Sequence, residues 1–306
     1  MVHPGSDGQP FPLLTELIAA LSQETPPEVL VFGDSVMERV SQHDTDTRTL
    51  GRMICEALPA RRCHVASRTA LNPTLMRALM RVVRRLHPPR LVVLPVNMRA
   101  FSPQWDLNPA WEMHQELGIL EAWLSNPDLP IAPLWDLRKS DDLHASYERT
   151  AVRYPLSELD TIGAFRRVIA TDPENGTEKQ RRKREIFVYH YTHPLTENHR
   201  KLVDLVGATE LCRLVGAVPL LYVTPINVET GRELVGEQFT EALAANIECV
   251  RSALAPVASL RDYSAELPSS DFFAEDLATE HLNQHGRTVL ARRIAREIDA
   301  MLVPKA

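Results

Sequence analysis

The sequence predicts a doubly wound α/β sandwich built around a parallel sheet. Five short runs rich in leucine and β-branched residues are typical of buried strands: Val29–Phe32, His64–Ala66, Arg90–Val96, Pro219–Val223 and Val257–Leu260. Segments with a helical pattern separate these runs, and alternation of strand and helix is typical of a parallel sheet covered by helices on both faces. In such folds ligands bind beyond the carboxyl ends of the strands. Functional residues are therefore expected in the loops that follow the strands.

Helices are predicted over Thr47–Leu58, Pro73–Leu86 and, at the end of the chain, Thr288–Leu302. The second of these begins with Asn72 followed by Pro73. Asparagine is a favourable cap and proline is well suited to the first turn of a helix, so this start is the best defined.

A long stretch between the third and fourth predicted strands sets the domain organisation. It is too long for a single crossover connection and contains a further helix-like segment, Ala110–Leu124. We expect one α/β domain over residues 1–306, with residues 98–200 forming a helical cap inserted after the third strand.

Composition favours small-molecule chemistry over nucleic-acid binding. The chain has 34 Lys and Arg against 40 Asp and Glu, and a formal net charge of −6, which argues against a protein held by phosphate contacts. The basic run Lys179–Arg184 is more typical of a solvated face than of a polyanion site. The start of the chain lacks the pattern of a signal peptide, and no run reaches the length of a membrane span. We expect a cytoplasmic protein with no nucleic-acid or membrane partner; its oligomeric state is left open.

The four cysteines, Cys55, Cys63, Cys212 and Cys249, are predicted to be buried free thiols, because no two are spaced as in zinc or redox motifs.

His190 and His193 lie close together in the sequence, but no carboxylate stands beside them at ligand spacing. We therefore expect neither a metal nor another cofactor.

The tripeptide Gly33-Asp34-Ser35 directly follows the first predicted strand and places a hydroxyl at the carboxyl edge of the sheet. A serine hydroxyl is a poor nucleophile unless a base removes its proton. His281, in the segment before the final helix, supplies such a base, and His285 is the competing candidate. Taken alone, this serine also fits a helix cap and this histidine a surface residue.

These segments resemble the conserved blocks of the SGNH (GDSL-like) serine hydrolase superfamily. The first block of that family is Gly-Asp-Ser, the third supplies an asparagine after a strand, and the last supplies a histidine. Here the third block is Leu94-Pro95-Val96-Asn97, although Pro95 and Met98 replace the usual glycine and aspartate. The resemblance implies a flavodoxin-like sandwich in which Ser35 is the nucleophile, His281 the base and Asn97 an oxyanion donor.

The second block of the family supplies a glycine whose backbone N–H also binds the oxyanion, together with that of Ser35. An ungapped comparison places Arg68 at that position. The backbone of Arg68 retains a donor, and its guanidinium is suited to clamping a carboxylate or phosphate of the substrate. Asp34 and Arg99 are further candidates for substrate binding.

The acid of the family normally stands three residues before the histidine, where this chain has Ala278. Asp276 and Glu280 are the candidates for orienting His281, and we favour Asp276. If neither carboxylate reaches the imidazole, a backbone carbonyl takes that role.

The prediction is a serine esterase that forms an acyl-enzyme with an ester or thioester of a small molecule. An acyltransferase shares the first half-reaction and stays open as an alternative. A non-catalytic binding module of the same fold is the alternative from a different class, suggested by Arg68, Met98 and Ala278. A nucleotide-binding protein is disfavoured because no glycine-rich phosphate motif follows the first strand.

Overall fold

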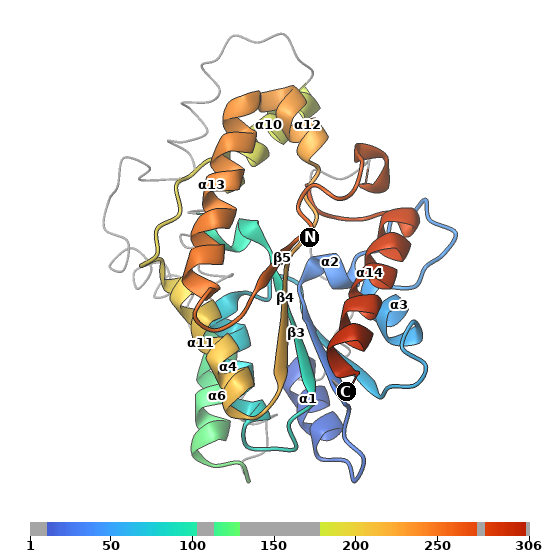
Figure 1. Ribbon diagram of the computed structural model, residues 1–306, viewed down its shortest axis with the longest axis vertical. Coiled ribbons are helices and arrows are strands. Elements are labelled where there is room, and N and C mark those ends of the chain that lie inside the picture. Colours follow the sequence, from blue (N-terminus) through green and yellow to red (C-terminus); the bar gives the residue numbers. More distant parts are fainter. Residues whose placement is uncertain (1–10, 103–112, 129–177, 274–278, 304–306) are drawn as a thin grey trace.

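The computed structural model describes residues 11–102, 113–128, 178–273 and 279–303. Its centre is a five-stranded parallel sheet with the order β2-β1-β3-β4-β5 (Figure 1). The strands are β1 (Val29–Gly33), β2 (Cys63–Ser67), β3 (Leu91–Val96), β4 (Val218–Val223) and β5 (Leu260–Asp262). This is the strand order of flavodoxin-like sheets, so the predicted fold class is confirmed.

The register brings the ends of the central strands together. Gly33 at the end of β1 pairs with Ser67 at the end of β2, and β1 pairs with β3 on its other side. Because β1 lies between strands reached by connections in opposite directions, the β1/β3 boundary is the switch point where ligands bind in such sheets. Residues that follow β1, β2 and β3 therefore emerge at one edge.

Four of the five predicted strands match the observed ones within a residue or two at each end. The fifth prediction, Val257–Leu260, was largely wrong, since β5 begins only at Leu260. The N–H groups of Val257 and Ala258 donate instead to the carbonyl of Leu254. Val257 and Ala258 thus belong to the turn that ends α13, where their backbone N–H groups satisfy a terminal carbonyl.

Helices cover both faces of the sheet. The helices are α1 (Pro12–Leu21), α2 (Ser35–Glu38), α3 (Leu50–Glu56), α4 (Pro73–Val83), α6 (His114–Ser125), α10 (Glu178–Tyr191), α11 (Arg200–Leu214), α12 (Val228–Val235), α13 (Glu237–Leu254) and α14 (Gln284–Leu302), with short 3₁₀ turns η1 (Met98–Phe101) and η3 (Ser269–Asp271). Figure 1 shows α3 and α14 on one side of the sheet and α4, α11 and α13 on the other. The molecule is thus a three-layer sandwich.

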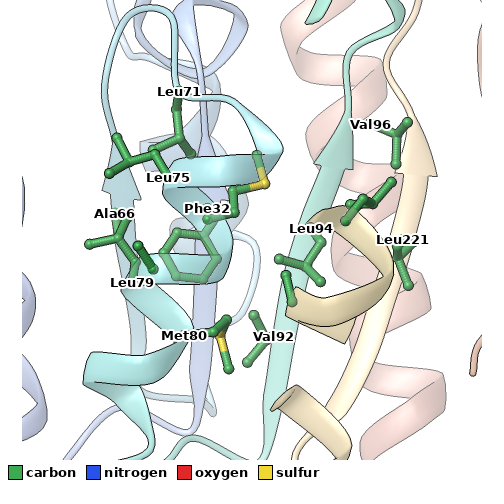
Figure 2. Close-up of a cluster of buried hydrophobic side chains, with 14 of the residues drawn as sticks. Phe32, Ala66, Leu71, Leu75, Leu79, Met80, Val92, Leu94, Val96 and Leu221 are labelled. Carbon is green, nitrogen blue, oxygen red and sulfur yellow. The ribbon is translucent and has the colours of Figure 1, made fainter. Parts of the chain in front are cut away.

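Alternating side chains of the strands feed the two cores. Leu30 and Phe32 of β1 pack on the α4 side, whereas Val29 and Val31 pack on the α3 and α14 side. Figure 2 shows Phe32 against Leu79 of α4. Burial of a side chain of this size contributes roughly 1.5–3 kcal/mol, so these strand residues hold the layers together.

Local capping explains where the predicted helices begin. Helix α4 starts as predicted, and Oδ1 of Asn72 accepts a hydrogen bond from the Leu75 N–H at 3.1 Å. Helix α3 starts later than predicted, after Thr49, whose hydroxyl accepts the N–H of Arg52. Helix α6 overlaps the predicted segment 110–124, of which 110–112 lies outside the described residues.

The final helix begins earlier than predicted. Oδ1 of Asn283 accepts the N–H groups of His285 and Gly286, so α14 starts at Gln284 rather than Thr288. His285 consequently lies in the first turn of the helix, and His281 stays in the preceding extended segment.

The prediction of free thiols is wrong for two of the cysteines. Cys55 and Cys63 form a disulfide, with their Cα atoms 5.4 Å apart, whereas Cys212 and Cys249 are free. The short connection from α3 to β2 turns the chain back on itself and brings these two side chains into range. Their sequence spacing resembles no redox motif and therefore provided no sign of it.

The described parts of the predicted cap pack against the sheet and its helices. Trp123 of α6 and Phe187 of α10 belong to the same buried cluster as the inner side of α4. The basic run 179–184 lies in α10. Residues 103–112 and 129–177 of the cap prediction lie outside the described residues. None of the helices in the described ranges combines the length and the apolar character needed to span a bilayer.

Candidate active site

The structure places Ser35 where strand β1 passes into helix α2. Asp34 is extended, with φ −101° and ψ −155°, and its Oδ1 caps the helix by accepting the Val36 N–H at 2.9 Å. A side chain at Gly33 would collide with Met37 of α2, so only glycine allows the helix to fold back this closely. Ser35 is therefore held as the first residue of a helix at the carboxyl edge of the sheet.

His281 meets Ser35 across the sheet edge. Its Nε2 lies 3.1 Å from Oγ of Ser35, although the two residues are 246 positions apart. The backbone near His281 is tied down by the hydrogen bond from the Phe273 N–H to its carbonyl, and the Phe273 ring stands edge-on to the imidazole. The predicted serine and histidine are thus within hydrogen-bonding distance.

Asn97 emerges from β3 next to Asp34. Its Oδ1 accepts the N–H of Arg99 at 3.1 Å, which turns the amide nitrogen toward Asp34, where Nδ2 donates to Oδ2 at 2.6 Å. Both Asp34 oxygens are engaged by the protein, and the residue is only 4% exposed. Asp34 therefore ties the first and third blocks together, and its predicted contact with substrate gains no support from this geometry.

Burial dominates the electrostatics of Asp34. It raises the pKa of the carboxyl group, and the hydrogen bonds from Asn97 and the Val36 N–H lower it only in part. The net shift is upward, which means that the folded protein holds the Asp34 carboxylate at some cost in free energy.

The observed position of Arg68 corrects the sequence prediction. Its backbone N–H donates to the carbonyl of Gly33 at 3.0 Å and so continues the β1/β2 ladder by one residue. An amide hydrogen used in the ladder is not directed at an oxyanion. The guanidinium forms an ion pair with the buried carboxylate of Glu116 and lies over the ring of Phe11, which leaves the predicted substrate clamp already occupied by a protein anion.

Arg99 and Glu280 form an ion pair that the sequence did not reveal. The pair joins Nη1 of Arg99 to Oε1 of Glu280, and Oε2 of Glu280 accepts the N–H and the hydroxyl of Thr279 at 2.9 and 2.8 Å. Burial by itself raises the pKa of Glu280, but Arg99, His281 and Thr279 together outweigh it and the pKa is lowered. Glu280 is therefore held as a carboxylate.

The described residues do not test Asp276 as the acid that orients His281, since Asp276 and Ala278 lie outside them. Glu280, the other candidate, has both carboxylate oxygens engaged by Arg99 and Thr279. The competing base His285 points elsewhere, since its Nδ1 pairs with Oδ1 of Asp271 at 2.8 Å.

Helix α10 also reaches this region. The hydroxyl of Tyr191 lies 2.6 Å from Oγ1 of Thr279, and burial raises the pKa of Tyr191 well above its ordinary value. The cluster of tyrosine and histidine in residues 189–193 was the available sequence signal, because it stands near the end of the predicted cap. His190, the residue before Tyr191, forms a second serine–histidine contact: its Nδ1 lies 2.9 Å from Oγ of Ser102, and both side chains are buried.

Within the ranges that the structure describes, no three histidine, cysteine or acidic side chains gather as a metal site would require. His190 is instead engaged by Ser102.

Comparison with known proteins shows a likeness of fold. No protein-family model and no curated protein matches the chain. Among solved structures, the chain is similar to a lipase/acylhydrolase from Enterococcus faecalis, with 14% sequence identity and a TM-score of 0.39, over 91% of this chain and 98% of the other. A likeness at this level shows nothing about the chemistry of the site.

Proposed function

We propose that this protein is a serine hydrolase that cleaves an acyl ester or thioester of a small molecule. The observation that carries the proposal is the 3.1 Å contact between Oγ of Ser35 and Nε2 of His281 at the carboxyl edge of the sheet. A nucleophile within hydrogen-bonding reach of a base, at the place where such sheets bind ligands, is the arrangement that acyl transfer needs. The motif order that resembles the SGNH superfamily adds independent support.

The proposed reaction proceeds in two halves. Oγ of Ser35 attacks the acyl carbon while Nε2 of His281 takes its proton, and the tetrahedral intermediate collapses as the imidazolium protonates the departing alcohol or thiol. Water then attacks the acyl-enzyme with His281 as base, and the acid is released as Ser35 regains its proton.

The proposed oxyanion donors are the backbone N–H of Ser35 and Nδ2 of Asn97. The amide of Asn97 is oriented in advance, because Arg99 engages its oxygen and Asp34 engages its nitrogen. Donors that are already aligned cost no reorganisation when charge develops in the transition state. Arg68 is not included, since its N–H belongs to the sheet ladder.

Asp276 stays the proposed partner of the His281 imidazole, on the basis of its place in the sequence. A carboxylate there would hold one tautomer of His281 and stabilise the imidazolium. Glu280 is the poorer candidate because its two oxygens already serve Arg99 and Thr279.

The proposal is tested by turnover of p-nitrophenyl acetate and of a short acyl thioester, beside covalent labelling with a fluorophosphonate probe. We expect hydrolysis and a single adduct on Ser35, identified by mass spectrometry, and loss of both in Ser35→Ala and His281→Gln. Turnover that survives Ser35→Ala contradicts the mechanism. A folded wild-type protein that neither turns over nor labels points to the binding module instead.

A further inference from the structure

A buried ion pair connects the segment that carries the proposed base to the one that carries the proposed oxyanion donor. Glu280 immediately precedes His281, and Arg99 lies two residues after Asn97. The two side chains pair across the sheet edge, with 2% and 16% of their surfaces exposed respectively. A buried ion pair this close to His281 and Asn97 can fix the distance between them.

On the side of His281, both carboxylate oxygens of Glu280 are engaged. Oε1 meets Arg99, whereas Oε2 accepts two hydrogen bonds from Thr279. The hydroxyl of Thr279 is in turn met by Tyr191 of α10 at 2.6 Å. The backbone that leads into His281 is therefore fixed through side chains of two other elements, Arg99 of η1 and Tyr191 of α10.

On the serine side, the connection continues without a break. The backbone N–H of Arg99 donates to Asn97, Nδ2 of Asn97 donates to Asp34, and Asp34 caps the helix that begins with Ser35. The Arg99–Glu280 pair closes this path between the nucleophile and the base.

The alternative role for Arg99 is the predicted contact with substrate. Its Nε has no partner within the described part of the chain, so the guanidinium retains a donor. Its charge, however, is compensated by Glu280. Turning Arg99 toward an anionic substrate would leave the buried Glu280 carboxylate without a counter-charge, which is costly at this depth. The geometry therefore favours a role within the protein.

We propose that Arg99 and Glu280 act together as positioning residues that set His281 in register with Ser35 and Asn97. This inference rests on the proposed hydrolase function and adds to it a pair that does not touch the reacting atoms. Its distinguishing feature is coupling, because each member of the pair works only while the other is present.

The test compares Arg99→Met, Glu280→Gln and the double variant, using p-nitrophenyl acetate and the rate of fluorophosphonate inactivation. A small misplacement of catalytic groups costs about 10²-fold in rate, so each single variant is expected to lose about that much in kcat, with KM nearly unchanged. The inactivation rate is expected to fall in parallel. The double variant is expected to be no slower than the slower single variant. Arg99→Lys, which keeps the charge, is expected to regain part of the loss.

A matched pair on another side of the molecule provides the control. Arg77 and Asp204 pair at 2.8 Å between α4 and α11. Arg77→Met and Asp204→Asn are expected to leave kcat at the wild-type value, whatever they do to the melting temperature. All variants are assayed well below their own melting temperatures.

The outcomes separate the competing explanations. An increase in KM at constant kcat for Arg99→Met overturns positioning in favour of a substrate clamp. Losses that multiply in the double variant overturn the coupling, and variants indistinguishable from an active wild type overturn the inference as a whole. A wild-type protein inert to both ester and probe overturns the proposed function as well.

Discussion

Two serine–histidine contacts in this protein invite comparison. Oγ of Ser35 lies 3.1 Å from His281, and Oγ of Ser102 lies 2.9 Å from His190. The first contact stands at the carboxyl edge of the sheet, and Ser35 is partly exposed. The second joins the end of η1 to α10, where Ser102 and His190 are 2% and 4% exposed.

Because the two contacts differ in exposure and in position, a hydrogen bond between serine and histidine does not by itself define a nucleophile. Ser35 begins a helix whose cap, Asp34, accepts a hydrogen bond from Asn97, and Ser35 is partly exposed. Ser102 and His190 satisfy each other inside the protein, as buried polar groups must. We assign chemistry to the first pair and packing to the second.

Removing each serine hydroxyl in turn tests this assignment most directly. Ser35→Ala is expected to lower ester turnover by about 10⁴–10⁶-fold, because it removes the proposed nucleophile. Ser102→Ala is expected to leave turnover near the wild-type value. Steady-state hydrolysis of p-nitrophenyl acetate measures both, and a large loss in Ser102→Ala would contradict the assignment.

The side-chain amides of Asn97 and Asn246 offer a second comparison, between a proposed oxyanion donor and a buried structural amide. Asn97→Ala is expected to lower kcat by about 10²–10³-fold, because it removes the proposed side-chain donor to the oxyanion. Asn246 is the matched control: its buried amide donates to the carbonyls of Tyr191 and His193 at 3.0 and 2.9 Å. Asn246→Ala is expected to lower stability and to spare kcat. Equal kcat values for Asn97→Ala and the wild type would remove Asn97 from the site.

Stability is expected to rank the two serines in the opposite order. Ser102→Ala leaves the buried His190 without its hydroxyl partner, and loss of one partner of a buried hydrogen bond costs about 1–3 kcal/mol. Ser35→Ala is expected to cost less, since Ser35 is accessible to water. Urea unfolding measures the free energy of unfolding of both variants. A larger loss of stability for Ser35→Ala would contradict this ranking.

The two carboxylates of the site are expected to respond to acid with opposite signs. The pKa of Glu280 is lowered from 4.5, so its contribution to stability is present above that pH and is lost as the pH falls through the folded-state pKa. The pKa of Asp34 is raised from 3.8, so the cost of its ionisation is relieved as the pH falls through its folded-state value.

Unfolding free energies measured between pH 3 and 7 test this smallest effect. Glu280→Gln is expected to flatten the loss of stability below about pH 4.5, whereas Asp34→Asn is expected to steepen it. Identical acid profiles for the two variants would show that the environments of these carboxylates do not differ in this way.

Much of the site could be predicted because its residues follow local rules. Ser35 stands after a run of buried strand residues, and Asn97 stands after another, so parallel strands bring both to one edge. Their partners could not be predicted in the same way. Arg99 pairs with a residue 181 positions away, and the amide of Arg68 is taken by the carbonyl of a neighbouring strand.

Local sequence patterns were enough to predict the alternation of strands and helices, the capped start of α4, and the placement of a serine directly after β1. These features depend on periodicity and capping within a few residues of each other. The tertiary structure alone decided which charge neutralises Arg99, that the Arg68 amide joins the sheet ladder, and that Cys55 bonds to Cys63. Such contacts depend on strand order and on how loops pack at the sheet edge, and these involve residues whose separation along the chain carries no local pattern.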